Sequence, residues 1–521
     1  MASQERKRIF LLGTASTYGE NVVKIIVGLV SVPIGLHYFG PVRYGILAVI
    51  SSVIAYLNIS NLGIPTATSV LIAKAPEPFE QWAILRRSLF LLLVSSAIVL
   101  SVVLGIAHFY PNWVVALGKI PADLRGEATE AAIAIAILFL LNLPLYVFSS
   151  GFLGLQEIYW CRFYAFLTTI GSLAALILTV FLLKGNLVTL ALFRGVVTLS
   201  VSILCALHFL FAHSGLRQKF SDPIGKEFSI KSIFSSGIRF FIIGIAAMVV
   251  WNTDNLVISH FLGTGAVAPY AITFRVFTML FLVFITINST LFPMYGKAVG
   301  LKQWDWIQRT YKKATQLLPI IGGLVWIGGV AFAKNIIEIW AGPNAYGGML
   351  VVFALGGYGY LLSMVNIHAS LLTGLNATKN IVFIGWAEAI ANLGLSIALI
   401  GSLGIGGVAL GTFLASLLTV FWMLPQDIYR QTGKRVKFPF WPIIRHAFFI
   451  LIPCLIISIL VQHYWQNEVS KIFANVIIIG IYLILSWWII PLDLRNLIKN
   501  ALTGLCTRIK TAGVLINKIL L

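Results

Sequence analysis

Long apolar runs dominate this sequence and leave little choice of fold. Stretches of about 20 apolar residues are long enough to cross the hydrocarbon core of a bilayer as helices. Reading for such stretches predicts fourteen membrane spans. The predicted spans are residues 14–37, 44–64, 88–110, 129–150, 160–183, 187–212, 238–259, 266–293, 314–333, 347–373, 380–402, 404–424, 443–463 and 473–490.

Composition supports the same fold class. The chain is 59% hydrophobic and 10% charged, with a mean hydropathy of +0.94. Soluble domains do not reach these values, so we expect an all-α, polytopic membrane protein. The formal net charge is +20. Most basic residues stand between the predicted spans, which indicates contact with membrane lipids and no nucleic-acid partner.

The distribution of basic residues predicts the topology. If the N-terminus is cytoplasmic and the spans alternate, inner segments hold 28 of the 37 Lys and Arg residues. Outer segments hold six and the spans hold three. This asymmetry is what the positive-inside rule requires, so both termini are expected in the cytoplasm. The basic stretch before the first span precedes a run too long for a cleaved signal peptide, which predicts an uncleaved anchor.

An internal repeat predicts two lobes in the same orientation. HisTyrPheGlyProValArgTyr (37–44) resembles HisPheLeuGlyThrGlyAlaValAlaProTyr (260–270), with Gly40 matching Gly263 and Tyr44 matching Tyr270. Transporters are often built from such repeats. We therefore expect a first six-span lobe at 1–212, a cytoplasmic loop at 213–237 and a second six-span lobe at 238–425. Two accessory spans would lie in 426–490, followed by a cytoplasmic amphipathic helix in 491–521.

Six ionisable residues fall inside predicted spans, where charge is costly and normally faces a protein interior or a water-filled path. They are Glu20, Lys24, Arg194, Asp254, Arg275 and Glu388. Glu20, Asn21 and Lys24 share a helical face with Gly28. Structural explanations remain open for several of these residues. Glu20 and Lys24 could neutralise each other at their i, i+4 spacing. Asp254 and Arg275 could form an ion pair, and Arg194 could extend to the membrane interface.

The sequence contains none of the catalytic or cofactor-binding motifs considered below. There is no GxxxxGK[ST] loop for a nucleotide and no His or Cys cluster with metal-ligand spacing. The four cysteines are scattered and are expected to pack without disulfides. We therefore expect a transporter without cofactors rather than an enzyme.

The first two spans carry a resemblance to a known family. GlyLeuValSerValProIleGlyLeuHisTyrPheGlyProValArgTyrGly (28–45), followed by IleSerAsnLeuGlyIleProThrAlaThr (59–68), is similar to the start of oligosaccharide flippases of the O-antigen (Wzx) type. These flippases belong to a larger superfamily that also contains multidrug/cation antiporters and the lipid II flippase. The resemblance implies alternating access and transport of a polyprenyl-diphosphate-linked oligosaccharide across the cytoplasmic membrane for cell-surface polysaccharide biosynthesis. Other polysaccharide-assembly proteins would be its possible partners.

The resemblance also implies roles for the intramembrane charges. Flippases of this type are thought to use a cationic cavity for the diphosphate, which here would involve Lys24, Arg194, Arg275 and Asn21. Glu20, Asp254 and Glu388 would be candidates for ion coupling. The sequence departs from a simple cationic cavity because three intramembrane charges are positive and three are negative.

Three other functions compete with the flippase hypothesis. A multidrug/cation antiporter would share the fold but would need a site that favours cations, usually with twelve spans. A membrane glycosyltransferase or polysaccharide polymerase normally needs a sizeable outer loop, and the longest outer loop predicted here is only about 111–128. A scaffold without transport activity would have no use for buried charges.

Overall fold

The computed structural model describes residues 2–217, 228–375, 377–490 and 495–496. Within these residues the regular elements are all helices, so the prediction of an all-α fold is confirmed. Part of the predicted inter-lobe loop, and the predicted amphipathic helix except for residues 495–496, lie outside the described residues.

The chain folds into two compact units that interleave along the sequence. The first unit contains Met1–Met279, Asn335–Val351 and Val382–Ala415, and the second contains the remaining segments. The first nine α-helices are α1 (Ala2–Leu57), α2 (Ile64–Lys74), α3 (Pro78–Phe109), α4 (Arg125–Asn142), α5 (Tyr146–Gly154), α6 (Ile158–Ile177), α7 (Leu187–Ala212), α8 (Ile230–Leu262) and α9 (Val267–Gly300). The others are α10 (Trp304–Ala341), α11 (Met349–Gly374), α12 (Thr378–Leu403), α13 (Ile405–Leu418), α14 (Val420–Gln431), α15 (Phe440–His446), α16 (Ile452–Tyr464) and α17 (Glu468–Ile489). Helices α9, α10, α11, α12 and α13 run through both units.

The helices are long and apolar enough for a multi-pass membrane protein. Among the described residues, twelve helical segments qualify as candidate spans by length and composition. One of them, Ser16–Asn61, contains two of the predicted spans, and α8 is not among the twelve. The exact count of fourteen and the division into two six-span lobes therefore stay predictions.

Gly40 divides α1 into two spans. A straight helix of the 56 residues in α1 would be roughly 84 Å long, far more than a bilayer needs. The chain breaks at Gly40, whose φ of 73° and ψ of 170° are not helical. Only glycine adopts this conformation readily because it has no Cβ atom. The predicted turn after the first span is thus present at this glycine.

The same backbone conformation recurs at two other turns of the first unit. Gly263, at the end of α8, has a φ of 93° and a ψ of 163°, and Gly342, after α10, has 98° and 164°. The agreement between Gly40 and Gly263 is consistent with the repeat predicted from the sequence. The third turn extends the pattern, because GlyProAsnAlaTyr (342–346) repeats the spacing of GlyProValArgTyr (40–44).

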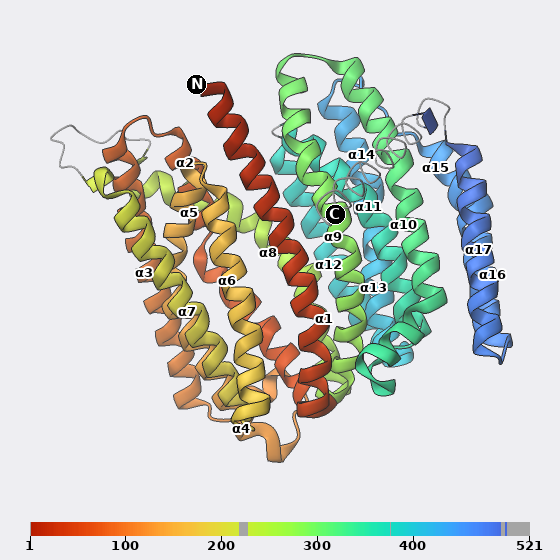
Figure 1. The fold of residues 1–521 in the computed structure, drawn as a ribbon, viewed down its shortest axis with the longest axis horizontal. Coiled ribbons are helices and arrows are strands. Elements are labelled where there is room, and N and C mark those ends of the chain that lie inside the picture. The colour runs from red at the N-terminus through yellow and green to blue at the C-terminus, as the bar shows by residue number, and fades with distance from the viewer. Residues whose placement is uncertain (1, 218–227, 376, 491–494, 497–521) are drawn as a thin grey trace, which may run out of the picture. The chain divides into compact units, whose positions relative to one another are not determined.

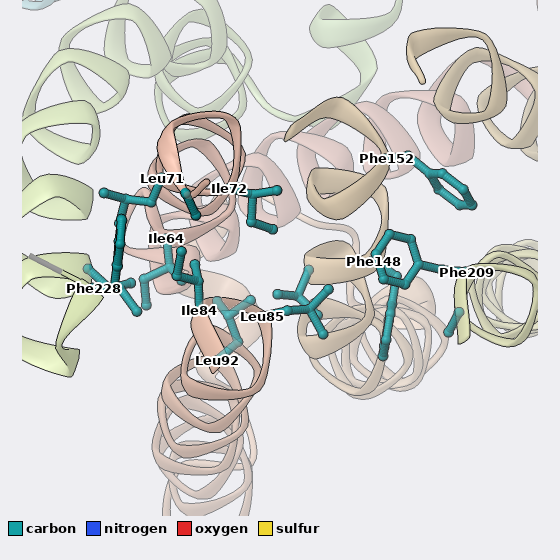
Figure 2. Close-up of a cluster of buried hydrophobic side chains, with 14 of the residues drawn as sticks. Ile64, Leu71, Ile72, Ile84, Leu85, Leu92, Phe148, Phe152, Phe209 and Phe228 are labelled. Carbon is teal, nitrogen blue, oxygen red and sulfur yellow. The ribbon is translucent and has the colours of Figure 1, made fainter. Parts of the chain in front are cut away.

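A hydrophobic cluster holds the helices around α2 together (Figure 2). Ile64 and Ile72 of α2 pack in it with Ile84 of α3, and aromatic side chains of α5 and α7 join them. Gly154 of α5 lies so close to α2 that a Cβ atom on it would be 2.7 Å from side-chain atoms of Ile72. Burial of these large apolar side chains holds α2, α3, α5 and α7 against one another.

In the second unit, polar contacts attach the accessory helices to α10. Helices α16 and α17 lie side by side (Figure 1), and Ser458 Oγ donates to Asn475 Oδ1 between them at 2.6 Å. Tyr482 of α17 donates to the Ile320 carbonyl of α10 at 2.8 Å, where a Cβ on Gly323 would collide with the Tyr482 hydroxyl. In lipid such bonds orient helices that hydrophobicity alone cannot hold in register.

Candidate functional site

An ion pair lies on the polar face of α1. Lys24 Nζ contacts Glu20 Oε1 across one helical turn. The Glu20 side chain is 1% exposed, whereas the Lys24 side chain is 50% exposed. The expectation that these residues neutralise each other therefore describes Glu20 well, but half of Lys24 remains accessible to a ligand.

Arg162 of α6 is a second partner of Glu20, and sequence reasoning missed it. Its Nη1 donates to Glu20 Oε2 at 3.0 Å. Arg162 stands at the very start of the predicted span 160–183, so the charge distribution counts it with the inner basic residues. The signal was available, because α6 begins at Ile158 and IleTyrTrpCys (158–161) provides an apolar turn before this arginine. Arg162 Nε is buried and has no hydrogen-bond partner among the described residues.

Arg275 of α9 lies against α1 one turn beyond Lys24. A Cβ atom on Gly28 would be 3.0 Å from Arg275 Nη2 and 2.7 Å from the terminal methyl of Met279. The glycine at residue 28 leaves room for this close approach of the guanidinium group. Gly28 follows Lys24 at the i, i+4 spacing, so both cations border the same face of α1. Arg275 is exposed.

Tyr44 connects this face to Arg194 of α7. The Tyr44 ring lies against Gly35 of α1, where a Cβ atom would be 3.5 Å from the ring edge. The phenol is within electrostatic range of both Arg275 and Arg194. Arg194 Nε is buried without a hydrogen-bond partner in the described part of the chain. Arg194 thus belongs to the surroundings of Tyr44, and its extension to the membrane interface stays a prediction.

Four cationic side chains lie along or near α1. We call Lys24, Arg162, Arg194 and Arg275 the α1 cluster; the carboxylate that accompanies it is Glu20. In the low-dielectric interior of a membrane protein, charges interact far more strongly than in water. Guanidinium groups present several N–H donors in a planar fork that matches phosphate oxygens. The two buried Nε atoms, which have no partner among the described residues, mark donors that an anionic ligand or water can satisfy.

Asp254 of α8 belongs to a separate polar network and not to an ion pair with Arg275. Tyr270 donates to Asp254 Oδ2, and Thr412 Oγ1 of α13 donates to the same oxygen at 3.2 Å. Asn392 Nδ2 of α12 donates to Thr412 Oγ1 at 2.8 Å. Asp254 Oδ1 and Asn392 Oδ1 are both buried without a hydrogen-bond partner in the described residues. Two buried oxygen acceptors of this kind can receive a proton or a cation.

Glu388 and Asn21 complete the set of predicted site residues. Glu388 is half-buried on α12 and precedes Asn392 by one helical turn, so it borders the Asp254 network along the helix. Asn21 is half-buried on α1 next to Glu20. The roles of both residues, in ion coupling and in substrate binding, stay predictions.

Comparison with known families decides where this chain belongs. Residues 10–299 match the family model described as polysaccharide biosynthesis protein, which covers more than half of the chain. The chain belongs to the polysaccharide biosynthesis protein family. The match includes the four residues of the α1 cluster, Glu20 and Asp254. A second model, MatE, matches residues 240–393 of this family member.

Two Salmonella proteins are relatives of this chain. A candidate O-antigen transporter of Salmonella typhi is 23% identical over 448 residues, covering 82% of this chain and 97% of its own. A candidate O-antigen transporter of Salmonella typhimurium is 27% identical over 203 residues, and the match spans 38% of this chain and 46% of the relative. Among solved structures, the lipid II flippase MurJ in an inward closed conformation has a TM-score of 0.66 at 15% identity. That match covers 91% of this chain and 98% of MurJ, which shows a shared transporter fold.

The double contact of Glu20 predicts unequal effects of two substitutions on stability. Lys24→Ala leaves Glu20 bonded to Arg162, so we expect a loss of at most about 1 kcal/mol, as for exposed ion pairs. Glu20→Ala removes the acceptor of two cations, and we expect a loss of roughly 1–3 kcal/mol. Thermal unfolding of the purified variants in one detergent measures both effects. Equal losses for the two variants would mean that Arg162 does not hold Glu20.

Proposed function

We propose that this protein is a flippase that moves a polyprenyl-diphosphate-linked oligosaccharide from the inner to the outer leaflet of the cytoplasmic membrane. The transported unit would serve the synthesis of a cell-surface polysaccharide. The single observation that carries this proposal is the α1 cluster, in which four cationic side chains accompany one buried carboxylate. Membership of the polysaccharide biosynthesis protein family supports the substrate class.

The α1 cluster supplies what a diphosphate needs inside a membrane. Lys24 is on α1, and Arg275 of α9 lies against α1 one helical turn further along, at Gly28. Both side chains are exposed, and they would receive the two phosphate groups. Arg194 and Asn21 would contact phosphate or sugar oxygens. Arg162 would contribute indirectly, because it also pairs with Glu20. Lys24 could then leave Glu20 and bind the ligand. The polyprenyl chain would stay in lipid, since an apolar tail gains nothing from a polar cavity.

The contacts of the carboxylates support a cationic site beside α1, although the sequence shows an even balance of charges. Asp254 is engaged by Tyr270 and Thr412 in a separate network. Arg162 adds a cation that the sequence places at the membrane boundary and the structure places on Glu20. The polarity of the site near α1 therefore favours an anionic ligand.

A multidrug/cation antiporter is the second candidate, favoured by the MatE match over residues 240–393. A cationic drug at this site would have to approach the four cations of the α1 cluster, which repel it in a low-dielectric environment. Binding of a cation to this cluster is therefore unfavourable. We prefer the flippase on this electrostatic ground.

The proposal includes a location and a topology. Multi-pass membrane character follows from the twelve candidate spans among the described residues, and the charge distribution supports a cytoplasmic membrane with both termini inside. The lobes would be 1–212 and 238–425, rocking about the site in alternating access. Membrane lipids and other polysaccharide-assembly proteins are the partners that this role calls for.

The flipping prediction uses cells that lack the gene. We expect these cells to lack the surface polysaccharide, which gel analysis of the polymer measures. We also expect them to accumulate polyprenyl-diphosphate-linked oligosaccharide, which mass spectrometry of extracted lipids measures. Wild type and Lys24→Arg should restore the polymer, whereas Lys24→Ala should reduce it roughly tenfold, as for loss of one charge-assisted contact. Lys471→Ala, which removes a lysine paired with Glu468 on α17, is the matched control at equal expression. Full activity of Lys24→Ala, or no accumulation in the deletion strain, contradicts the proposal.

The coupling prediction concerns Asp254. Its carboxylate is buried, and one of its oxygens has no partner among the described residues, so we expect it to exchange a proton or a cation during transport. Asp254→Asn preserves the shape and should abolish the acceleration of flipping by an imposed ion gradient in proteoliposomes. Glu388→Gln tests the neighbouring carboxylate in the same assay. If both variants respond to proton and sodium gradients like the wild type, these carboxylates do not couple transport to ions.

The topology prediction uses single cysteines in a variant without native cysteines. Ala116 is exposed between α3 and α4, and Gln303 is exposed between α9 and α10. In intact cells an impermeant thiol reagent should label Ala116→Cys and should not label Gln303→Cys, because positive-inside topology places residue 303 in the cytoplasm. Labelling of Gln303→Cys should appear only after the membrane is permeabilised. The reverse pattern would invert the topology.

A further inference from the structure

Pro33 leaves a carbonyl of α1 without its helical donor. Proline has no backbone N–H, so the carbonyl four residues earlier, that of Leu29, receives no bond from residue 33. Within a membrane span such a group needs another donor, either from the protein or from water in a polar cavity. The structure supplies one: Trp340 Nε1 donates to the Leu29 carbonyl oxygen at 2.7 Å.

The position of this bond connects it to the α1 cluster. Trp340 is the penultimate residue of α10, in the segment Asn335–Val351 that belongs to the first unit together with α1. Leu29 directly follows Gly28, against which the Arg275 guanidinium lies. Two helices from the predicted second lobe, α9 and α10, thus contact consecutive residues of α1 on the side of the Gly40 turn.

From this geometry we infer that Trp340 is a latch that holds the end of α10 on α1 and controls opening of the outer side of the site. The inference rests on the alternating access of the proposed function. The indole replaces the missing helical donor only while α10 lies on α1. Separation of the two helices leaves the Leu29 carbonyl without a protein donor, so water must enter at the level of Gly28 when the outer side opens. Trp340 is therefore a positioning residue and does not itself bind substrate.

Pro33 makes the latch testable by a double-mutant cycle. Trp340→Phe removes the indole donor and keeps an aromatic ring in place. Pro33→Ala restores an N–H group that can donate to the Leu29 carbonyl within the helix, so the indole becomes dispensable. A role in packing alone would give Trp340→Phe the same effect in both backgrounds.

The readout is the rate at which an impermeant thiol reagent labels Thr278→Cys in intact cells, in a variant without native cysteines. Thr278 lies one turn beyond Arg275 on α9 and is half-buried. With Pro33 present, Trp340→Phe should raise the labelling rate roughly fivefold, the factor expected from one net hydrogen bond. In the Pro33→Ala background, Trp340→Phe should leave the rate within about twofold of the Pro33→Ala single variant, the residual expected when two sites no longer interact.

Controls separate the latch from other effects. Trp441→Phe alters an exposed tryptophan of α15 and should leave the labelling rate unchanged. Equal acceleration by Trp340→Phe with Pro33 present and in the Pro33→Ala background, or no acceleration in either, overturns the latch. The labelling needs no transported substrate, so the latch can fail while flipping is demonstrated, and it can hold if the substrate proves to be different.

Discussion

The hydrocarbon core of a bilayer contains no water, and every polar group of this protein that enters it must find a partner inside the chain. The backbone shows this requirement most clearly in α1, where Pro33 removes one donor and the indole of Trp340 replaces it at the Leu29 carbonyl. The same requirement restricts the breaks between spans to positions such as Gly40, where a glycine conformation turns the chain at the end of a helix.

The charged side chains near α1 also find partners inside the protein, but the cations outnumber the carboxylate that they accompany. Glu20 is nearly completely buried and is held by Lys24 and Arg162, so a single carboxylate has two cationic partners. Arg194 and Arg162 each keep a buried Nε without a partner among the described residues. A buried donor that lacks a hydrogen-bond partner is costly to retain unless something compensates it. Under the proposed function, a ligand that carries its own negative charge would offset this surplus during part of the transport cycle.

The sequence was sufficient for the fold class, because span length and hydropathy depend on local composition. It also identified Glu20, Lys24 and Arg275, since charge within an apolar run is visible without a structure. Arg162 was missed because it stands at the edge of a predicted span, where an arginine at the membrane surface is expected anyway. The contact of Asp254 with Thr412 could not be predicted either, because Thr412 lies on a helix far along the chain. Sequence periodicity gives the face on which a residue lies but not the helix that it meets.

The position of Gly28 brings the proposed anion site next to the proposed latch. Arg275 approaches α1 there, and the next residue, Leu29, accepts the bond from Trp340. A phosphate group that binds Lys24 and Arg275 would draw the guanidinium group toward the ligand and away from the backbone at Gly28, since charge-assisted bonds to phosphate are stronger than contacts with a neutral helix. The contacts involved lie within residues 24–29 of α1, so movement of Arg275 acts directly beside the carbonyl that holds α10. Occupancy of an anion site and release of an outer latch can therefore be coupled through adjacent residues of one helix, without a longer pathway through the protein.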